Sequence, residues 1–359
     1  MRPVLFIAGH VPAYRIGALR QLHEREQIEL ALFGGRSRHG GPAVPAAPPL
    51  PHSHVRAHEL WPLAASGRYR AVICPTAGRL APLAGWAGAR RAGAPLVLWA
   101  SLWAHPRTAA HAFTYLPLRR LYRSADAIVT YGPHVSAYVR ARGARNVHIA
   151  PQSVDNDFWS AHVNETPRAP LWPAQAAVRF LFVGRPAREK GVDVLLDAWR
   201  SSGLAGSGAA LVLVGGDRGG RRGEQDGVVS MGALDAAALR SVYAASEVLV
   251  VPSITTRTFR EPWGLVINEA MNRGLTVIAS DAVGAVAGGL VRDGDNGLVV
   301  PAGDVAALAD ALRRLSADAG LRARLGSRAR EDVRAYSHEA WARGFSAALG
   351  SVCVARERW

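Results

Sequence analysis

Short apolar runs alternate with amphipathic segments along most of the chain. The runs are rich in Val, Ile and Leu and are bounded by Gly, Pro or charged residues, which is typical of buried parallel strands. The segments between them carry apolar residues at helical spacing, so they predict helices. In the first half the predicted strands are 4–8, 28–33, 71–74, 95–100, 127–131 and 147–150, and the predicted helices are 16–25, 108–124 and 133–142.

The second half of the chain repeats this alternation. Its predicted strands are 179–184, 210–214, 228–231, 248–251, 276–279 and 298–300, and its predicted helices are 192–200, 236–245, 265–273 and 305–315. Strands that alternate with helices indicate βαβ units and parallel sheets. The fold class is therefore α/β, with two Rossmann-like domains that face each other across a cleft. In such sheets ligands bind beyond the carboxyl ends of the strands, where loops meet helix N-termini.

The length of 359 residues favours two domains of about 150 to 200 residues each. We expect an N-terminal domain over 1–170, a second domain over 171–335, and a C-terminal helix within 336–359 that returns to the N-terminal domain. Residues 34–51 are rich in Gly, Pro and Ala and predict a loop. Residues 164–175 contain three prolines and predict the interdomain linker.

The composition favours a folded chain without membrane spans. Apolar residues make up 49% of the chain, which is enough to fill two cores and excludes general disorder. No apolar stretch approaches the roughly 20 residues of a membrane span, and the opening residues resemble a first strand more than a signal peptide. Cys74 and Cys353 cannot form a disulfide framework or a four-ligand zinc site. We therefore expect a cytoplasmic protein in a reducing compartment.

The charge is strongly positive and unevenly distributed. The chain carries 43 Lys and Arg against 28 Asp and Glu, a formal charge of +15. Up to residue 176 there are 20 basic and 8 acidic residues, and beyond it there are 23 and 20. Such a field attracts polyanions, anionic membranes or phosphorylated ligands, although a genome that favours Arg explains the same numbers without a partner. We interpret the surplus as attraction to an anionic acceptor or to the inner face of a membrane, where the protein would bind peripherally.

Lysine is nearly absent from the basic set, since Lys190 is the only one and all others are arginine. Lys190 lies in the loop 184–191, between a predicted strand and a predicted helix. Gly184 allows a tight turn after the strand, so that Arg185 and Lys190 place two cations at its carboxyl end. There they can bind a diphosphate and neutralise it as it leaves. The alternative is an ordinary connection with solvated charges.

A second motif joins two carboxylates, Glu261 and Glu269, across a Pro-x-Gly turn that begins a helix. Pro262 favours a break that leaves Glu261 in the loop, whereas Glu269 lies about one turn inside the helix. Both carboxylates can accept hydrogen bonds from sugar hydroxyls, and the amides near Gly264 and Leu265 can bind a phosphate or sugar oxygen. The alternative is a favourable helix-start charge and a solvated face. Glu269 lies in a mostly apolar run, where an unpaired carboxylate would be costly.

With both motifs in this order, the chain resembles the retaining, nucleotide-sugar-dependent glycosyltransferases of family 4, which have the GT-B fold. The resemblance is strongest from residue 178 to 315. Its motifs are 182–185, 189–196, 211–216, 251–253, Glu261 to Glu269, and 293–301. In the first half it rests on the strand pattern and on 150–155, which is similar to the family's interdomain connection.

The resemblance implies that the N-terminal domain binds the acceptor and that the second domain binds the nucleotide sugar. Arg185 and Lys190 would hold the donor diphosphate. Glu261 would hydrogen-bond the transferred sugar, assisted by the amides of Gly264 and Leu265. By this resemblance Glu261, Lys190 and Arg185 are also catalytic residues.

The remaining donor contacts follow from the same resemblance. Glu269 would bind the ribose hydroxyls, and the backbone from Gly232 to Leu234 would border the base. Two segments depart from the family pattern: the run 284–287 has no carboxylate where the family often has Pro-Glu, and the loop 254–260 is longer and more basic. Both departures concern contacts to the donor sugar rather than the reaction class.

Three residues of the first half are implied in acceptor binding. His105, just after the predicted strand 95–100, is the nearest candidate for the histidine that the family places near the reacting carbon, and it would be both catalytic and acceptor-binding. His10 and Arg15 follow the first strand, where acceptors bind in such enzymes. A histidine in a loop is more often structural, which is the alternative for His105.

We predict neither a metal nor a cofactor. The pairs Asp155/Asp157 and Asp293/Asp295 have the spacing of divalent-ion ligands, but both lie where turns are expected. The cations of the Lys190 loop would take the place of a metal on the leaving diphosphate. Activity should therefore persist in excess chelator.

The predicted function is a retaining glycosyltransferase, EC 2.4, that moves a sugar from a UDP- or GDP-sugar to an acceptor hydroxyl. The acceptor would be a glycan, a lipid-linked or a small molecule, in the synthesis of a cell-envelope polysaccharide, a glycolipid or a natural-product glycoside. A nucleotide-sugar epimerase of similar architecture is the alternative. A basic nucleic-acid-binding module is disfavoured because no zinc-finger spacing or RNA-recognition signature occurs. A pyridoxal phosphate-dependent phosphorylase needs a Schiff-base lysine, and the only lysine already lies in the phosphate loop.

Overall fold

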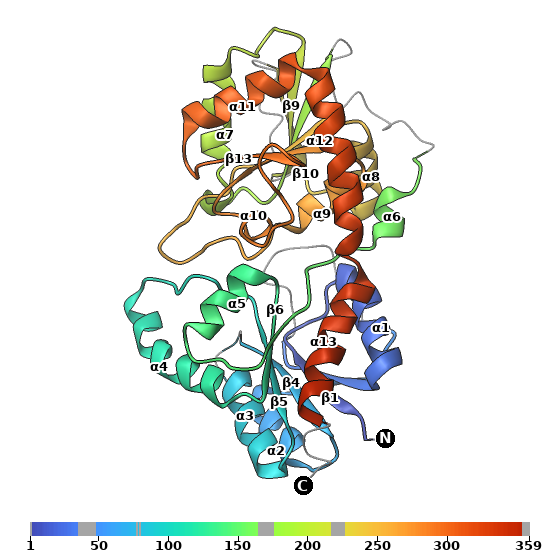
Figure 1. The fold of residues 1–359 in the computed structure, drawn as a ribbon, viewed down its shortest axis with the longest axis vertical. Coiled ribbons are helices and arrows are strands. Elements are labelled where there is room, and N and C mark those ends of the chain that lie inside the picture. The colour runs from blue at the N-terminus through green and yellow to red at the C-terminus, as the bar shows by residue number, and fades with distance from the viewer. Residues whose placement is uncertain are drawn as a thin grey trace. The chain divides into compact units, whose positions relative to one another are not determined.

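The structure is a computed structural model. It describes residues 2–34, 48–76, 78, 80–163, 176–216 and 227–353. The expected linker and most of the expected loop 34–51 lie outside these residues. The chain divides into two compact units: the first unit is Met1–Asp155 with Tyr336–Trp359, and the second unit is Asn156–Ala335 (Figure 1). The division thus falls after Asp155, whereas the sequence placed it after residue 170.

The first unit is built on a seven-stranded sheet in the order β3-β2-β1-β4-β5-β6-β7, and its described strand pairs are all parallel. The strands are β1 (Val4–Ala8), β2 (Ile28–Leu32), β3 (His52–His54), β4 (Ala71–Pro75), β5 (Leu96–Ala100), β6 (Ala127–Thr130) and β7 (Val147–Ile149). The helices are α1 (Ile16–Glu26), α2 (Leu60–Ala65), α3 (Ala81–Ala92), α4 (Ala109–Ser124), α5 (Pro133–Arg140) and α13 (His338–Cys353).

The C-terminal helix α13 packs against α1, β6 and β7 of the first unit (Figure 1). Its buried residues recur every three or four positions, which gives the helix one apolar stripe. Trp341 on this stripe is fully buried, with its ring centroid 5.8 Å from that of Trp99 and 4.4 Å from that of Phe345. This aromatic cluster anchors the last described segment of the chain to the N-terminal sheet.

The second unit is built on a six-stranded sheet in the order β10-β9-β8-β11-β12-β13, again with parallel pairs among the described residues. The strands are β8 (Val178–Val183), β9 (Ala209–Gly216), β10 (Val228–Gly232), β11 (Val248–Val251), β12 (Thr276–Ser280) and β13 (Gly297–Val300). The helices are α6 (Asn156–Ser160), α7 (Val192–Ser202), α8 (Ala236–Ala244), α9 (Leu265–Asn272), α10 (Gly284–Ala287), α11 (Val305–Ala317) and α12 (Ala319–Asp332).

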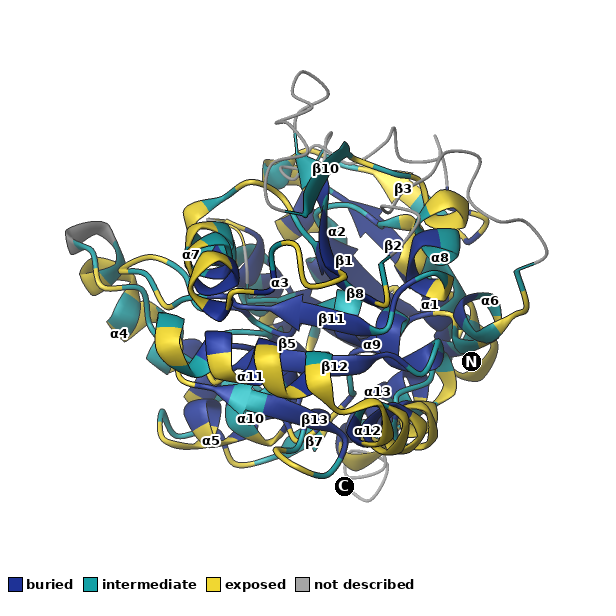
Figure 2. Ribbon diagram, turned by 90° about the horizontal axis from the view of Figure 1, so that it is seen from above, coloured by how far each residue is buried: buried dark blue, intermediate teal, exposed yellow. Residues whose placement is uncertain are grey.

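Both sheets confirm the α/β fold class of two Rossmann-like domains. Each predicted strand and helix is present, with ends that shift by a residue or two. Figure 2 shows the strands largely buried, while the covering helices carry exposed residues on their outer faces. Among the described residues no helix combines the length and apolarity that crossing a membrane requires.

Six strands and α-helices were absent from the sequence prediction: β3, α2, α3, α6, α10 and α12. The α3 segment has a weak helical signal because Gly85 and Gly88 lower its helix propensity. Their small size is what the packing needs, since a Cβ on Gly88 would lie 2.5 Å from Cβ of Ala64, and one on Gly85 would lie 2.9 Å from Sγ of Cys74. Close packing of α3 therefore offsets its low intrinsic propensity.

The strand order of each sheet fixes where loops converge. In the second unit the chain runs from β8 outward through β9 to β10 and then returns to β11 on the other side of β8. The loops that follow β8 and β11 therefore separate at a topological switch point, which is where open α/β sheets bind ligands. In the first unit the same reversal occurs between β1 and β4.

Candidate functional site

The loop after β8 contacts the loop after β11 closely. It forms a short 3₁₀ helix over Arg188–Lys190 and then turns through Gly191, whose φ of 70° is left-handed. A Cβ on Gly191 would lie 2.0 Å from the carbonyl oxygen of Pro252, so only glycine fits there. The backbone N–H of Ile254 donates to the carbonyl of Glu189 at 3.0 Å. These contacts hold the two predicted motifs together at the switch point.

Lys190 and Glu261 form an ion pair at this junction. The Lys190 Nζ donates a hydrogen bond to Oε2 of Glu261. Oγ of Ser253 lies 3.5 Å from the same oxygen, and Ser253 is almost fully buried. The Lys190 side chain is 22% exposed and that of Glu261 is 9% exposed, so the pair lies in a partly desolvated environment. The sequence assigned Lys190 to the donor diphosphate and Glu261 to the transferred sugar, and the structure brings the two side chains into direct contact.

Gly264 is the N-cap of α9 and adopts a left-handed φ of 95°. The first amides of a helix point toward its N-terminus and favour an anion or a polar oxygen there. Gly284 begins the neighbouring α10, and a Cβ on it would lie 2.0 Å from the carbonyl oxygen of Pro262. The run 284–287 therefore supports the Glu261 loop through its backbone, although it supplies no carboxylate of its own.

Glu269 lies on the second turn of α9, as the sequence predicts, and its polar partner is Tyr243 on α8. The Tyr243 hydroxyl donates to Oε2 of Glu269 at 2.8 Å. Burial raises the pKa of Glu269 to about 7, although the Tyr243 hydrogen bond acts in the opposite direction. Burial and the adjacent carboxylate also raise the pKa of Tyr243 well above its usual value. Glu269 is thus a carboxyl that titrates near neutral pH.

Arg185 is the more exposed cation of the Lys190 loop. Its side chain is 44% exposed and pairs with Glu189, four residues later, at 3.5 Å. On the other flank of the sheet, Gly232 ends β10 at a register irregularity, and Leu234 follows two residues later. Because the described strands are parallel, these residues lie beyond the same carboxyl edge of the sheet as Lys190.

His105 lies in the first unit, between β5 and α4. Its Nε2 is 2.8 Å from the carbonyl oxygen of His111, and its Nδ1 is 3.4 Å from the Tyr138 hydroxyl. The Tyr115 ring packs edge-on against it at 5.3 Å. Both ring nitrogens therefore have partners within the first unit, which is the arrangement expected of a structural histidine. Its role near the reacting carbon stays a prediction.

Arg15 occupies the β1 side of the first unit's switch point and is only 4% exposed. Its guanidinium lies 5.5 Å from the Trp99 ring and 5.2 Å from the Trp341 ring, while Nη2 donates to Oε1 of Gln152 at 2.5 Å. Nη1 is buried and has no hydrogen-bond partner among the described residues. His10 lies two residues after the end of β1 and is half-buried.

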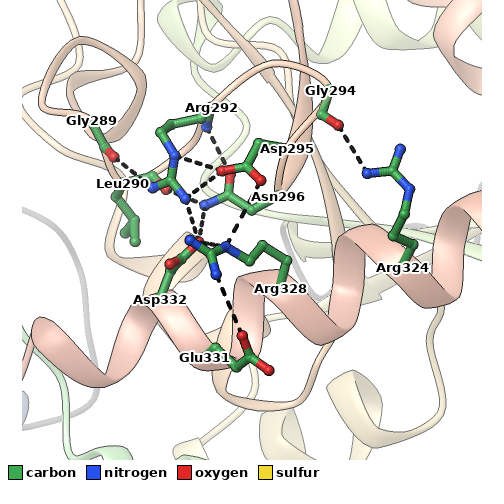
Figure 3. Close-up of polar contacts among 10 residues, drawn as sticks. All are labelled: Gly289, Leu290, Arg292, Gly294, Asp295, Asn296, Arg324, Arg328, Glu331 and Asp332. Atoms are coloured by element: carbon green, nitrogen blue, oxygen red, sulfur yellow. Dashed lines mark hydrogen bonds and ion pairs between the residues drawn. The ribbon is translucent and has the colours of Figure 1, made fainter.

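Asp293 and Asp295, one of the two pairs with metal-like spacing, have other partners in the second unit (Figure 3). Asp295 accepts a hydrogen bond from Nη2 of Arg292 at 2.5 Å, and the same nitrogen lies 2.6 Å from Asp332 on α12. Asp293 accepts from the backbone N–H of Val299 at 2.9 Å. No cluster of three His, Cys, Asp or Glu side chains suited to a metal occurs in the part of the chain that the structure describes. The segment 292–297 therefore joins the sheet to α12.

Two residues of the site were not identified from the sequence as partners of the glutamates. Tyr243 follows an alanine-rich stretch of α8, and a single aromatic on a helix normally indicates core packing. Ser253 belongs to the motif 251–253, in which its sequence context indicates no separate role. Their contacts to Glu269 and Glu261 depend on the tertiary fold, so no local signal reveals them.

The chain has two Rossmann-like sheets, with cations and carboxylates together at a switch point. This is the architecture of a GT-B glycosyltransferase. The Anabaena protein HepE, solved with UDP and glucose, has the same fold, with a TM-score of 0.73 and 19% identity over 98% of this chain and 100% of that one. That likeness concerns the fold.

Sequence relatives give the family. The family model described as glycosyl transferases group 1 matches residues 177–318. A D-inositol 3-phosphate glycosyltransferase of Xylanimonas cellulosilytica is 30% identical over 308 residues, 77% of this chain and 70% of that protein. A phosphatidyl-myo-inositol mannosyltransferase of Mycobacterium leprae is 37% identical over 162 residues, 44% of this chain and 42% of that protein. The chain belongs to the glycosyl transferases group 1 family, the family 4 glycosyltransferases, whose members retain anomeric configuration and use nucleotide-sugar donors.

Proposed function

We propose that this protein transfers a sugar, with retention and without a metal, from a nucleoside diphosphate sugar to an acceptor hydroxyl. The observation that carries the proposal is the contact between Lys190 and Glu261 at the β8/β11 switch point. It unites a cation suited to a diphosphate with a carboxylate suited to sugar hydroxyls. In the reaction the bond between the anomeric carbon and the diphosphate oxygen breaks, a bond to the acceptor oxygen forms on the same face, and the proton of the acceptor hydroxyl passes to the departing diphosphate.

In this proposal Lys190 and Arg185 bind the diphosphate and stabilise the negative charge that grows as it leaves. Glu261 accepts hydrogen bonds from the transferred sugar and, through its ion pair, orients Lys190. The amides at Gly264 and Leu265 contribute fixed donors at the N-terminus of α9. The structure supports these roles by placing all five residues at one edge of one sheet.

Glu269 would bind the ribose hydroxyls, with Tyr243 holding its carboxylate in place. A bidentate carboxylate that accepts from two vicinal hydroxyls must be ionised, and Glu269 approaches that state only near its raised pKa of about 7. Gly232 and Leu234 would border the base. Donor binding should therefore strengthen as the pH rises through neutrality.

The acceptor would bind to the first unit near the β1/β4 switch point, where Arg15 and His10 lie, with His105 after β5. Arg15 is buried and its described hydrogen bond goes to an amide oxygen rather than to a carboxylate. We infer that the acceptor is a hydroxyl-rich molecule with an anionic group that this guanidinium can complement. The names of both relatives contain a phosphorylated inositol, which is an acceptor of this chemistry.

A thermal-shift screen of nucleoside diphosphates and their sugars tests the donor assignment. A ligand at about 100 times its Kd stabilises the folded state by about 2.7 kcal/mol, so UDP or GDP should raise the melting temperature measurably. Lys190→Ala should abolish most of that shift. Arg179→Ala is the matched control, because Arg179 forms a 2.6 Å ion pair with Glu247 at the opposite end of β8. Equal shifts in the wild type and in Lys190→Ala would refute the assignment.

Turnover tests the reaction itself. Lys190→Ala and Glu269→Ala should each lower turnover at least about 100-fold, the scale for losing a charged transition-state or positioning contact. Inositol phosphate and free inositol, each supplied with UDP-glucose, separate an anionic from a neutral acceptor. Conversion of the donor without any acceptor would instead indicate an epimerase.

A further inference from the structure

The outer face of α4 carries apolar residues where a helix at a water-facing surface normally carries polar ones. Phe113 is 83% exposed and Leu116 is 67% exposed. Positions 113, 116, 120 and 123 lie along one stripe of the helix, and all four side chains are exposed. The stripe is apolar in its N-terminal half and basic in its C-terminal half. Figure 2 shows exposed residues along α4.

The segment of the chain that contains this stripe is almost uniformly basic. Residues 60–154 contain twelve arginines and a single acidic residue, Asp126. One carboxylate oxygen of Asp126 accepts a hydrogen bond from the backbone N–H of Leu96 at 2.8 Å, so this acid caps a strand. Arg119, Arg120 and Arg123 directly follow the apolar half of the stripe. We call Phe113, Leu116 and these three arginines the α4 surface.

A groove runs beside the α4 surface, between α3 and α4. It encloses about 630 Å³ and is lined by Leu83, Trp86, Leu116, Pro117, Arg119, Arg120, Leu121 and Arg123. Leu83, across the groove from α4, is 45% exposed. A second hollow of about 470 Å³ is lined by Arg123, Gly143, Ala144 and Arg145. The apolar groove therefore has a basic rim that continues onto the loop after α5.

We propose that the α4 surface docks the protein on an anionic phospholipid bilayer. Phe113 and Leu116 insert among the acyl chains, and Arg119, Arg120 and Arg123 bind the phosphates of the headgroups. Exposed apolar residues next to an arginine cluster are the pattern of helices that lie in the membrane interface. The combination favours a bilayer over a nucleic acid, because a polyanion in water offers no apolar layer for Phe113 and Leu116.

Flotation of the full-length protein with vesicles tests the proposal. The vesicles are phosphatidylcholine alone or phosphatidylcholine mixed with phosphatidylglycerol, each at low and high salt. The variants are the triple Arg119→Gln/Arg120→Gln/Arg123→Gln and the double Phe113→Ser/Leu116→Ser. The control is Arg314→Gln/Arg330→Gln/Arg334→Gln, which removes the same charge from exposed positions of the second unit.

The wild type and the control triple should float with anionic vesicles at low salt and remain in solution with phosphatidylcholine alone. Each arginine near an anionic surface contributes about a fivefold gain in partitioning, so the α4 triple should bind on the order of 100-fold more weakly. Loss of the two apolar side chains should weaken binding at least about tenfold. Equal binding to both vesicle types, or equal losses in the α4 triple and the control triple, would overturn the proposal.

Two further readouts complete the test. The melting-temperature shift with nucleoside diphosphate should be the same in all these variants, since none of the substitutions touches the Lys190 site. A failure of membrane docking is thereby separated from a failure of the proposed reaction. Binding to single-stranded RNA that equals vesicle binding and survives Phe113→Ser/Leu116→Ser would assign the surface to polyanions and refute membrane docking.

Discussion

Replacing Glu269 with Gln should make the stability of the second unit less dependent on pH. Burial raises the pKa of Glu269 from 4.5 to about 7, so the folded state retains a proton that the unfolded state has already released between these values. Stability therefore falls as the pH rises from 4.5 to 7, and the full cost of the buried charge is present above 7. At 1.36 kcal/mol per pKa unit, that cost is about 3 kcal/mol. Glutamine has the same shape and no charge, so it removes this cost.

The assay is urea unfolding of the wild type and Glu269→Gln at a series of pH values from 5 to 8.5. The variant should gain up to about 3 kcal/mol relative to the wild type at pH 8.5 and much less at pH 5. Tyr243→Phe, which removes the hydroxyl that stabilises the carboxylate, should move the pH-dependent range upward. A difference between the wild type and Glu269→Gln that stays constant with pH would show that Glu269 does not titrate as inferred.

Three other substitutions or conditions give direct tests. Gly191→Ala should lower the free energy of unfolding by more than about 2 kcal/mol, because it combines a left-handed φ of 70° with a Cβ 2.0 Å from the Pro252 carbonyl oxygen; an unchanged urea midpoint would contradict the close approach. Trp341→Ala should cost about 3 to 5 kcal/mol, since it empties a fully buried aromatic cluster with Phe345, and calorimetry of the full chain measures this loss. Turnover should be unaffected by excess chelator, and complete loss of activity there would remove the metal-independent mechanism.

Much of the fold could be predicted from the sequence because strand and helix signals are local. Apolar runs rich in Val, Ile and Leu indicate the strands that are long and buried. Strand β3 (His52–His54) was not predicted, because its sequence His-Ser-His has no alternation of apolar and polar residues. Helix α12 was not predicted, because its buried face is narrow and includes only a few residues, among them Leu321, Leu325 and Ala329. Such elements are specified by the neighbours they cover rather than by their own pattern.

The candidate site divides in the same way. Residue types and spacing indicated Lys190, Glu261 and Glu269, since each belongs to a short motif around a strand end. Sequence spacing does not reveal the residues that these side chains contact, because Tyr243 reaches Glu269 only after α8 and α9 have packed on the sheet. The contact of Lys190 with Glu261, 71 residues apart in the chain, likewise depends on the strand order. Strand order is a property of the whole sheet, and no single segment encodes it.

The proposed role of Lys190 bears on why this position has a lysine. Every other basic residue of the chain is arginine, including those on exposed helices. Lys190 approaches a carboxylate that is 9% exposed and that also lies 3.5 Å from the buried Ser253 hydroxyl. A compact ammonium can satisfy such a carboxylate with one contact and keep two N–H groups for a phosphate, whereas a planar guanidinium needs room for five donors in one plane. If Lys190 binds the donor diphosphate as proposed, an arginine at this position would have to serve Glu261 and the phosphate with one planar group. The proposed role therefore gives a reason for a lysine here in a chain otherwise rich in arginine.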